Sequence, residues 1–111
     1  MQWWSLLIGA RKLRAKARRF SRADDRLIQE ITTRHFPAGF TILNAVGGWF
    51  DSARRRFIHE ESRQVLIGGA TPAQVRRWGR ELGRALAQEE IVVIRIGTAL
   101  RLPVRGRARR S

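Results

Sequence analysis

The sequence predicts an α+β fold of the ferredoxin-like type, a sandwich in which two helices pack on one face of a mainly antiparallel sheet. Three observations lead to this prediction. Segments rich in β-branched and aromatic residues alternate with two segments of helical periodicity, in the order β-α-β-β-β-α-β. Glycine and proline punctuate the connections between these segments. The length of 111 residues suits one domain, which we place at residues 1–102.

The first strand is expected at Ser5–Gly9, within an apolar segment that starts at Gln2. This segment is too short to span a bilayer, and it lacks the basic region that precedes the apolar part of a signal peptide. Trp3 and Trp4 are interpreted as edge or core residues of the sheet, because indole rings are common packing units. Contact of these two rings with a membrane surface is the alternative interpretation.

The first helix is expected at Arg22–Arg34. Ser21 is a good N-cap, and the carboxylates of Asp24 and Asp25 lie in the first turn, where they favour the helix dipole. The helix should stop before Pro37, because the residue that precedes a proline avoids the helical region. Its apolar residues fall on one face at helical spacing: Leu27, Ile28 and Ile31.

The segment between the two helices is expected to form three strands, at Phe40–Val46, Arg56–Glu60 and Arg63–Gly68. The first two should be antiparallel neighbours, because Asp51–Arg55 has the length of a hairpin loop. The third contains the continuous apolar run from Val65 to Ile67, which is typical of a central strand covered on both faces.

The second helix is expected at Pro72–Gln88, because Thr71 is a good N-cap and proline suits the first helical position. Gly79 and Gly83 would let this helix lie close to the sheet. The run Ile91–Ile96 is expected as a second central strand. The apolar face of the helix consists of Val75, Trp78, Leu82, Ala85 and Leu86.

The chain is strongly basic, with 23 lysine and arginine residues against 9 acidic residues and a net charge of +14. Because arginine presents a planar fork that suits phosphate and carboxylate, we expect a polyanionic partner, either nucleic acid or an acidic protein surface. A coding bias toward arginine is the alternative explanation. The absence of cysteine excludes disulfides and thiolate chemistry, and it fits the cytoplasmic location that we expect.

Two arginine-rich segments are the expected contacts with this polyanion. One is a basic arm at residues 10–22, and the other is residues 103–111, which lack apolar periodicity and are expected to be a disordered tail. A solvated connection is the alternative interpretation of the arm. The arginines of the second helix are interpreted either as a basic stripe or as a solvated face. The predicted contact residues are Arg11, Lys12, Arg14, Lys16, Arg18, Arg19, Arg54, Arg55, Arg105 and Arg107.

A set of polar residues at the ends of the predicted elements forms a candidate pocket, in which carboxylates would do general acid–base work. Pairing of Glu60 and Glu89 with arginines such as Arg34, Arg63 or Arg84 is the structural alternative. Two histidines without cysteine make a poor metal site, so neither a metal nor a cofactor is expected. The candidate pocket consists of Thr41, Trp49, Glu60, Ser62, Gln88 and Glu89.

Four short motifs carry a resemblance to a known family. They are TRHFPAGFT at residues 33–41, GGW at 47–49, EES at 60–62 and QEEI at 88–91. In this order and spacing the chain resembles the bacterial family called domain of unknown function 3574. Glu61 stands where that family tends to have proline, and Asn44 where it often has aspartate. The resemblance supports the fold and implies no activity.

We therefore expect a small non-enzymatic binding module that holds a polyanion through its arginine-rich segments. Two alternatives remain open: an accessory subunit of a larger complex, and a small enzyme with a pocket near Trp49, Glu60 and Glu89. With both helices on one face, the other face of the sheet would be uncovered, so we also expect a homodimer.

Overall fold

The structure is a computed structural model that describes residues 1–10, 19–88 and 91–104. Its elements follow the order β-α-β-β-α-β, which confirms the expected ferredoxin-like α+β fold. The elements are β1 (Gln2–Gly9), α1 (Arg22–His35), β2 (Thr41–Asp51), β3 (Arg56–Gly68), α2 (Pro72–Ala85) and β4 (Val92–Thr98).

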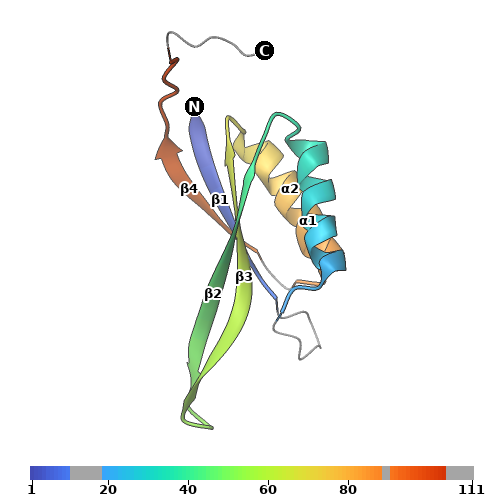
Figure 1. Ribbon diagram of the computed structural model, residues 1–111, viewed down its shortest axis with the longest axis vertical. Helices are drawn as coiled ribbons and strands as arrows, with labels where there is room; N and C mark the ends of the chain where they lie inside the picture. The colour runs from blue at the N-terminus through green and yellow to red at the C-terminus, as the bar shows by residue number, and fades with distance from the viewer. Residues whose placement is uncertain (11–18, 89–90, 105–111) are drawn as a thin grey trace.

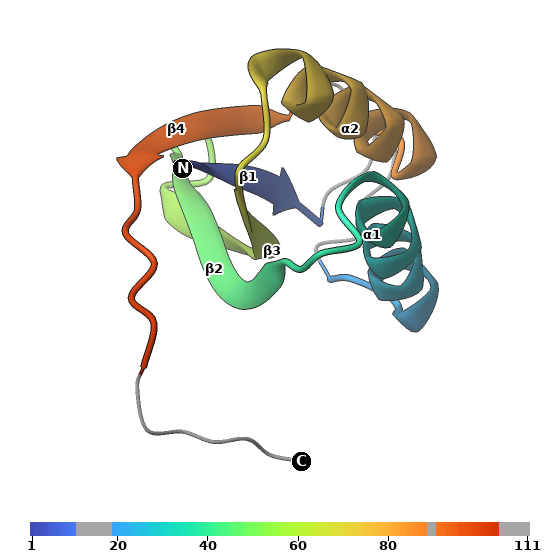
Figure 2. The same cartoon turned by 90° about the horizontal axis from the view of Figure 1, so that it is seen from above.

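All four strands are antiparallel to their neighbours and lie in the order β2-β3-β1-β4, with both helices on one face (Figures 1 and 2). The expectation that Ile91–Ile96 forms a central strand is wrong, because β4 is an edge strand. Val93 lies near Gly79 of α2, while Val92 and Ile94 are exposed. The strand is apolar on both faces, and this is the pattern that suggested a central position.

The two strands expected at Arg56–Glu60 and Arg63–Gly68 are one continuous strand of 13 residues, β3. Its polar middle stays in the ladder, since Glu61 pairs with Val46 and Ser62 with Ala45. Partners from outside the sheet bind two residues of this polar segment. Arg63 donates to Asp25 at 3.0 Å, and Glu61 Oε1 accepts from the backbone amide of Phe20 at 2.7 Å.

Both helices begin at the expected residue with a complete capping box. Ser21 Oγ accepts from the amide of Asp24 at 3.0 Å, and the Asp24 carboxylate accepts from the amide of Ser21 at 2.9 Å. Thr71 and Gln74 make the same pair of contacts at the start of α2. The end of α2 differs from the expectation, because the helix stops at Ala85 rather than Gln88.

The core lies between the helices and the sheet, and Trp78 is at its centre with no exposed surface. Its indole nitrogen donates to Thr32 Oγ1 at 3.0 Å, and its ring meets the ring of Phe36 edge-on at 5.2 Å. Trp4 is a core residue as well, and its nitrogen donates to the carbonyl of Ala70 at 2.9 Å. The buried aliphatic residues around them include Leu6, Ile8, Ile28, Ile31, Val65, Ile67, Val75 and Leu82.

The opposite face of the sheet, here called the open face, carries no helix (Figure 2). Leu43, Val92, Ile94 and Ile96 remain between 42% and 54% exposed in the sheet. Within the described residues, neither helix is long and apolar enough to cross a bilayer.

Candidate functional site

The residues of the expected pocket do not line one cavity. Strand alternation places Thr41, Trp49, Glu60 and Ser62 on the open face. Thr41, however, pairs with Leu66 near one end of the sheet, where it lines a pocket together with Met1 and Trp3, whereas Glu60 pairs with Gly47 near the other end. Gln88 lines a different groove beside α2, and Glu89 lies outside the described residues.

Glu60 lies against the backbone of β1, because a Cβ on Gly9 would be only 2.7 Å from Glu60 Oε1. Glu60 Oε2 is shielded from solvent and accepts no hydrogen bond from a described residue. His59 points to the other face of the strand, so alternation separates this carboxylate from the nearest imidazole in the chain. The described residues therefore bring no acid–base pair together around Glu60. Nowhere among the described residues do histidine and acidic side chains form a cluster that could hold a metal ion.

Most of the other described carboxylates have arginine partners within the fold. Glu81 binds Arg34 and His35, with His35 Nε2 at 2.8 Å from Glu81 Oε1. The hydrogen bond from Arg34 and then that from His35 lower the pKa of Glu81 to about 2. Arg63 holds Asp25 through two nitrogens, at 3.0 and 3.3 Å. Arg34 and Arg63, two of the partners suggested for Glu60, are thus engaged elsewhere.

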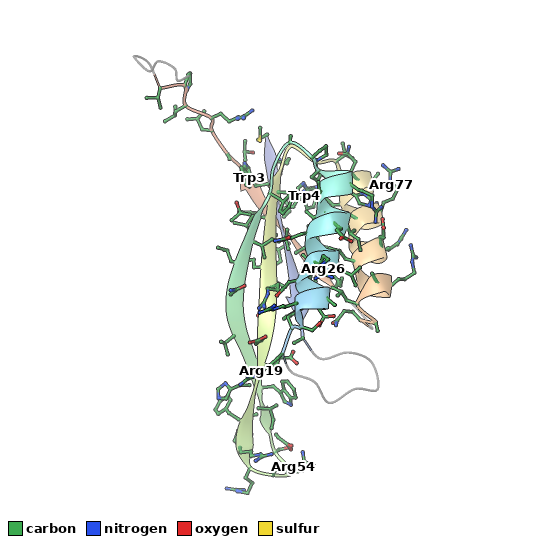
Figure 3. The ribbon with its side chains drawn as sticks, turned by 45° about the vertical axis from the view of Figure 1, so that its right-hand side comes forward. Trp3, Trp4, Arg19, Arg26, Arg54 and Arg77 are labelled. Carbon is green, nitrogen blue, oxygen red and sulfur yellow. The ribbon has the colours of Figure 1, made fainter. Side chains whose placement is uncertain are left out.

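The outer side of α2 carries four exposed arginines that take part in none of the ion pairs among described residues: Arg76, Arg77, Arg80 and Arg84. Arg77 points away from the body of the molecule (Figure 3). Three of the four line a groove of about 340 Å³ between α2 and β4, whose floor includes Val75, Ile91 and Val93. We call these four residues the α2 arginines. From the sequence, these arginines were interpreted either as a basic stripe or as a solvated face. The i, i+4 spacing of Arg76, Arg80 and Arg84 indicates that these three share one face of the helix.

The predicted polyanion contacts divide between described and undescribed parts of the chain. Arg19, Arg54 and Arg55 are described and exposed. The remaining seven, at positions 11–18 and 105–107, lie outside the described residues. Arg54 lies at the far end of the β2–β3 hairpin (Figure 3). Arg56, the first residue of β3, follows this loop and was missing from the prediction.

The outer part of this hairpin, residues 46–61, is here called the hairpin arm. Among the described residues, β1 pairs with β3 only from Ser62 onward, and the amide of Ala10 donates to the carbonyl of Glu61 at 2.9 Å. Beyond this point the two strands of the arm form a ladder only with each other in the described part of the chain. The arm extends past the ends of both helices (Figure 1). At its tip Asp51 Oδ1 accepts from the amides of Ala53 and Arg54, at 3.0 and 3.2 Å. The amide of Arg54 is the largest reason that the pKa of Asp51 lies below its usual range.

Two phenylalanine side chains are exposed on one face of the arm. Phe50 and Phe57 face each other across the ladder, with ring centroids 5.6 Å apart and an angle of 76° between the rings. Phe50 is 53% exposed and Phe57 is 65% exposed. The ring of His59 stacks on that of Phe57 at 6.3 Å and 22°. Aromatic side chains and arginines therefore lie together at one end of the molecule.

Solved structures with a similar fold come from proteins of different kinds. A phage SAM lyase in complex with S-methyl-5'-thioadenosine matches with a TM-score of 0.57 and 15% identity, covering 83% of this chain and 77% of the lyase chain. The GlnK–ATP complex of B. subtilis matches with a TM-score of 0.52 and 13% identity, covering 86% of this chain and 84% of GlnK. The divalent cation tolerance protein CutA of Archaeoglobus fulgidus matches with a TM-score of 0.52 and 11% identity, covering 89% and 86%. At such identities the similarity shows the fold alone.

Sequence comparison gives the family directly. None of the curated proteins matches this sequence. The model of a family described as a protein of unknown function, DUF3574, matches residues 5–95. This range contains all four motifs that carried the resemblance, and the chain belongs to the DUF3574 family.

Proposed function

We propose that this protein is a non-enzymatic binding module for a polyanion, with nucleic acid as its ligand. The α2 arginines, the loop at the tip of the hairpin arm and the two arginine-rich segments would supply the positive charge. One observation supports this proposal above the others. The described carboxylates Asp25, Asp51 and Glu81 are held by arginines within the fold, while the α2 arginines are exposed and form no ion pair with any described carboxylate.

Charge distribution links this observation to function. A carboxylate held inside the fold neutralises its own partner and leaves the outer guanidinium groups to attract anions from solution. Arginine forks bind phosphate oxygens with two parallel hydrogen bonds. The net charge of +14 would add a long-range attraction that steers a polyanion toward the surface.

A salt titration of binding to a generic DNA duplex tests the proposal. Each phosphate contact that is lost should lower the slope of log affinity against log salt by about 0.9. Changing Arg76, Arg80 and Arg84 together to glutamine should therefore reduce the slope by about 2.7. The matched lysine variant keeps the charges and should keep most of the slope. A second variant removes residues 103–111 and replaces the basic residues at 11–18 with serine, and its slope should fall as well.

The outcome that contradicts the proposal is a shallow slope for the unmodified chain, or one that stays unchanged in the glutamine and serine variants. Arg26→Gln serves as a positional control, because Arg26 is an exposed helical residue on α1, outside the proposed surface (Figure 3). Its effect on the slope should be close to zero.

A second copy of the chain is the partner that we propose for the open face. The supporting observation is the apolar surface formed there by Leu43, Val92, Ile94 and Ile96, which a monomer would leave in water. Sedimentation equilibrium of the unmodified chain and of Ile94→Glu tests this. We expect a homodimer that dissociates in the variant, because burying an unpaired carboxylate in an apolar interface is unfavourable. A monomeric unmodified chain would contradict it.

A further inference from the structure

We propose that the hairpin arm is a stacking platform for the bases of a single-stranded nucleic acid. This inference rests on the polyanion-binding function proposed above, and it adds the class of nucleic acid and the residues that would hold the bases. The arm combines two features that proteins use to bind single strands, which are exposed aromatic rings and nearby positive charges.

The first feature is the row of rings on one face of the arm. Phe50 and Phe57 occupy opposed positions in the ladder, and His59 continues the row along β3. Neither helix covers this part of the sheet, because the arm extends beyond them (Figure 1). More than half of each phenyl side chain is therefore in contact with solvent, where a base can stack on it.

The backbone of the arm also leaves room beside this row. Gly48 lies opposite His59 in the ladder, so β2 places no side chain next to the imidazole ring. A Cβ at this position would be 3.6 Å from His59 Nδ1, within van der Waals contact of the ring. The next residues on the same face of β2 are Val46 and Phe50. A base that stacks on Phe57 or His59 would thus meet no bulky neighbour at Gly48.

The second feature is the positive charge next to the rings. The turn that follows Asp51 carries Arg54 and Arg55, and Arg56 is the first residue of β3, directly before Phe57. Arg54 is paired with Asp51 at 3.2 Å, whereas Arg55 and Arg56 take part in none of the ion pairs of the described residues. Strand alternation places Arg56 on the opposite face from Phe57, so the phosphates that flank a stacked base would be contacted by Arg55 at the turn, and Arg56 would add positive charge nearby.

Charge is also the reason to favour a nucleic acid over an apolar protein partner on this surface. A protein that covered Phe50 and Phe57 would also approach the charged turn beside them, and it would bury part of the positive charge of that turn. Burying such charges without a counter-ion is strongly unfavourable. A single strand offers aromatic bases for the rings and phosphates for the arginines, so it matches both features.

The test compares two ligands on the full chain, an oligodeoxythymidine of about 12 nucleotides and an abasic oligomer of the same length. The two carry the same phosphates, but only the first has bases to stack. The unmodified chain should bind the oligodeoxythymidine at least about fivefold more tightly than the abasic oligomer. Changing Phe50 and Phe57 together to leucine should remove this difference and leave the affinity for the abasic oligomer unchanged.

Two further variants serve as controls. The double change of Phe50 and Phe57 to tyrosine keeps aromatic rings and should keep the preference for the oligomer with bases. The double change of Arg55 and Arg56 to glutamine should lower the affinity for both ligands by a similar factor. Circular dichroism of each variant establishes that the fold is intact, and the tyrosine variant carries the test if the leucine variant does not fold.

The possible outcomes separate this inference from the polyanion function. Equal affinity of the unmodified chain for the two ligands would overturn the stacking platform and leave polyanion binding standing. Loss of the preference in the tyrosine variant would overturn it as well. If the leucine change alters self-association in sedimentation and not the oligonucleotide preference, the arm is a contact between copies and the inference is wrong. Absence of binding to either oligomer would remove the polyanion function itself.

Discussion

The two ends of the β2–β3 hairpin share one ladder but have opposite surroundings. Near its inner end, Val65 and Ile67 of β3 face the helices and are buried. On the hairpin arm, Phe57 lies on the same face of the same strand and is 65% exposed. What differs is the cover, since α1 and α2 reach the inner end only (Figure 1). Strand alternation therefore sets the face on which a side chain lies, and the helices decide whether that face becomes core or a free surface.

The largest effect should come from the covered end. Trp78→Ala removes a fully buried indole and leaves Thr32 without the donor that it now accepts from. We expect the free energy of unfolding to fall by about 3–5 kcal/mol, as is typical of tryptophan truncation in a core. Urea denaturation monitored by circular dichroism measures this. A loss below about 1 kcal/mol would mean that the helices do not form the core described here.

A smaller loss of stability is expected from breaking the ion pair between Asp25 and Arg63 at the covered end. Asp25→Ala leaves the guanidinium of Arg63 buried without its main partner, and we expect a loss of about 1–2 kcal/mol. The expected loss is small for a buried charge that loses its partner, because the Asp25 side chain is 44% exposed and solvent screens its charge. Arg54→Gln breaks the corresponding pair on the arm, where exposure should make the loss smaller still. Equal losses in the two variants would contradict the comparison.

The largest contribution to the pH dependence of stability should also come from outside the arm, beside a smaller one from the lowered pKa of Asp51. The pKa of Glu81 is lowered to about 2 in the folded chain by Arg34 and His35. The unfolded chain therefore takes up a proton at this site first as the pH falls, and the contribution is fully present above about pH 4.5 and lost toward about pH 2. In Glu81→Gln this part of the acid-induced fall in melting temperature should be absent. An unchanged acid profile in the variant would count against this pair of contacts.

The smallest effect on stability should come from the arm itself. Phe57→Ser exchanges an exposed phenyl ring for a polar side chain, and we expect the free energy of unfolding to change by no more than about 0.5 kcal/mol. The same substitution should weaken binding of the oligodeoxythymidine, because it removes a ring. A large loss of stability would show that the ring of Phe57 is buried in solution, so that the arm contributes to the stability of the fold as the core does.

The outline of the fold could be read from the sequence because local chemistry determines it. Ser21 and Thr71 mark the starts of both helices through capping boxes, and the apolar residues of each helix recur at helical spacing. The end of α2 was misplaced because Ala87, with φ of 54°, turns the chain where no glycine or asparagine signals a stop. The division of β3 into two strands came from its polar middle, whose partners Asp25 and Phe20 are distant in sequence.

The separation of the candidate-pocket residues could not be predicted from the sequence for a related reason. Alternation places Thr41 and Glu60 on the same face of the sheet, but only the register shows that they lie opposite Leu66 and Gly47, at different ends of the ladder. Gln88 ends up beside α2, because the helix stops earlier than its apolar pattern suggests. Short motifs therefore indicated the elements correctly without indicating a common site.

By itself the sequence determined the starts of both helices, the order of the helical and strand segments, the strong positive charge and the family, all of which depend on residues close together along the chain. Only the tertiary structure decided which apolar faces are buried, which carboxylates neutralise which arginines, and that β4 lies at an edge. These properties depend on contacts between residues far apart in the chain. Phe57 and Val65 are apolar residues on the same face of β3. Their different exposure is set by how far the two helices extend over the sheet.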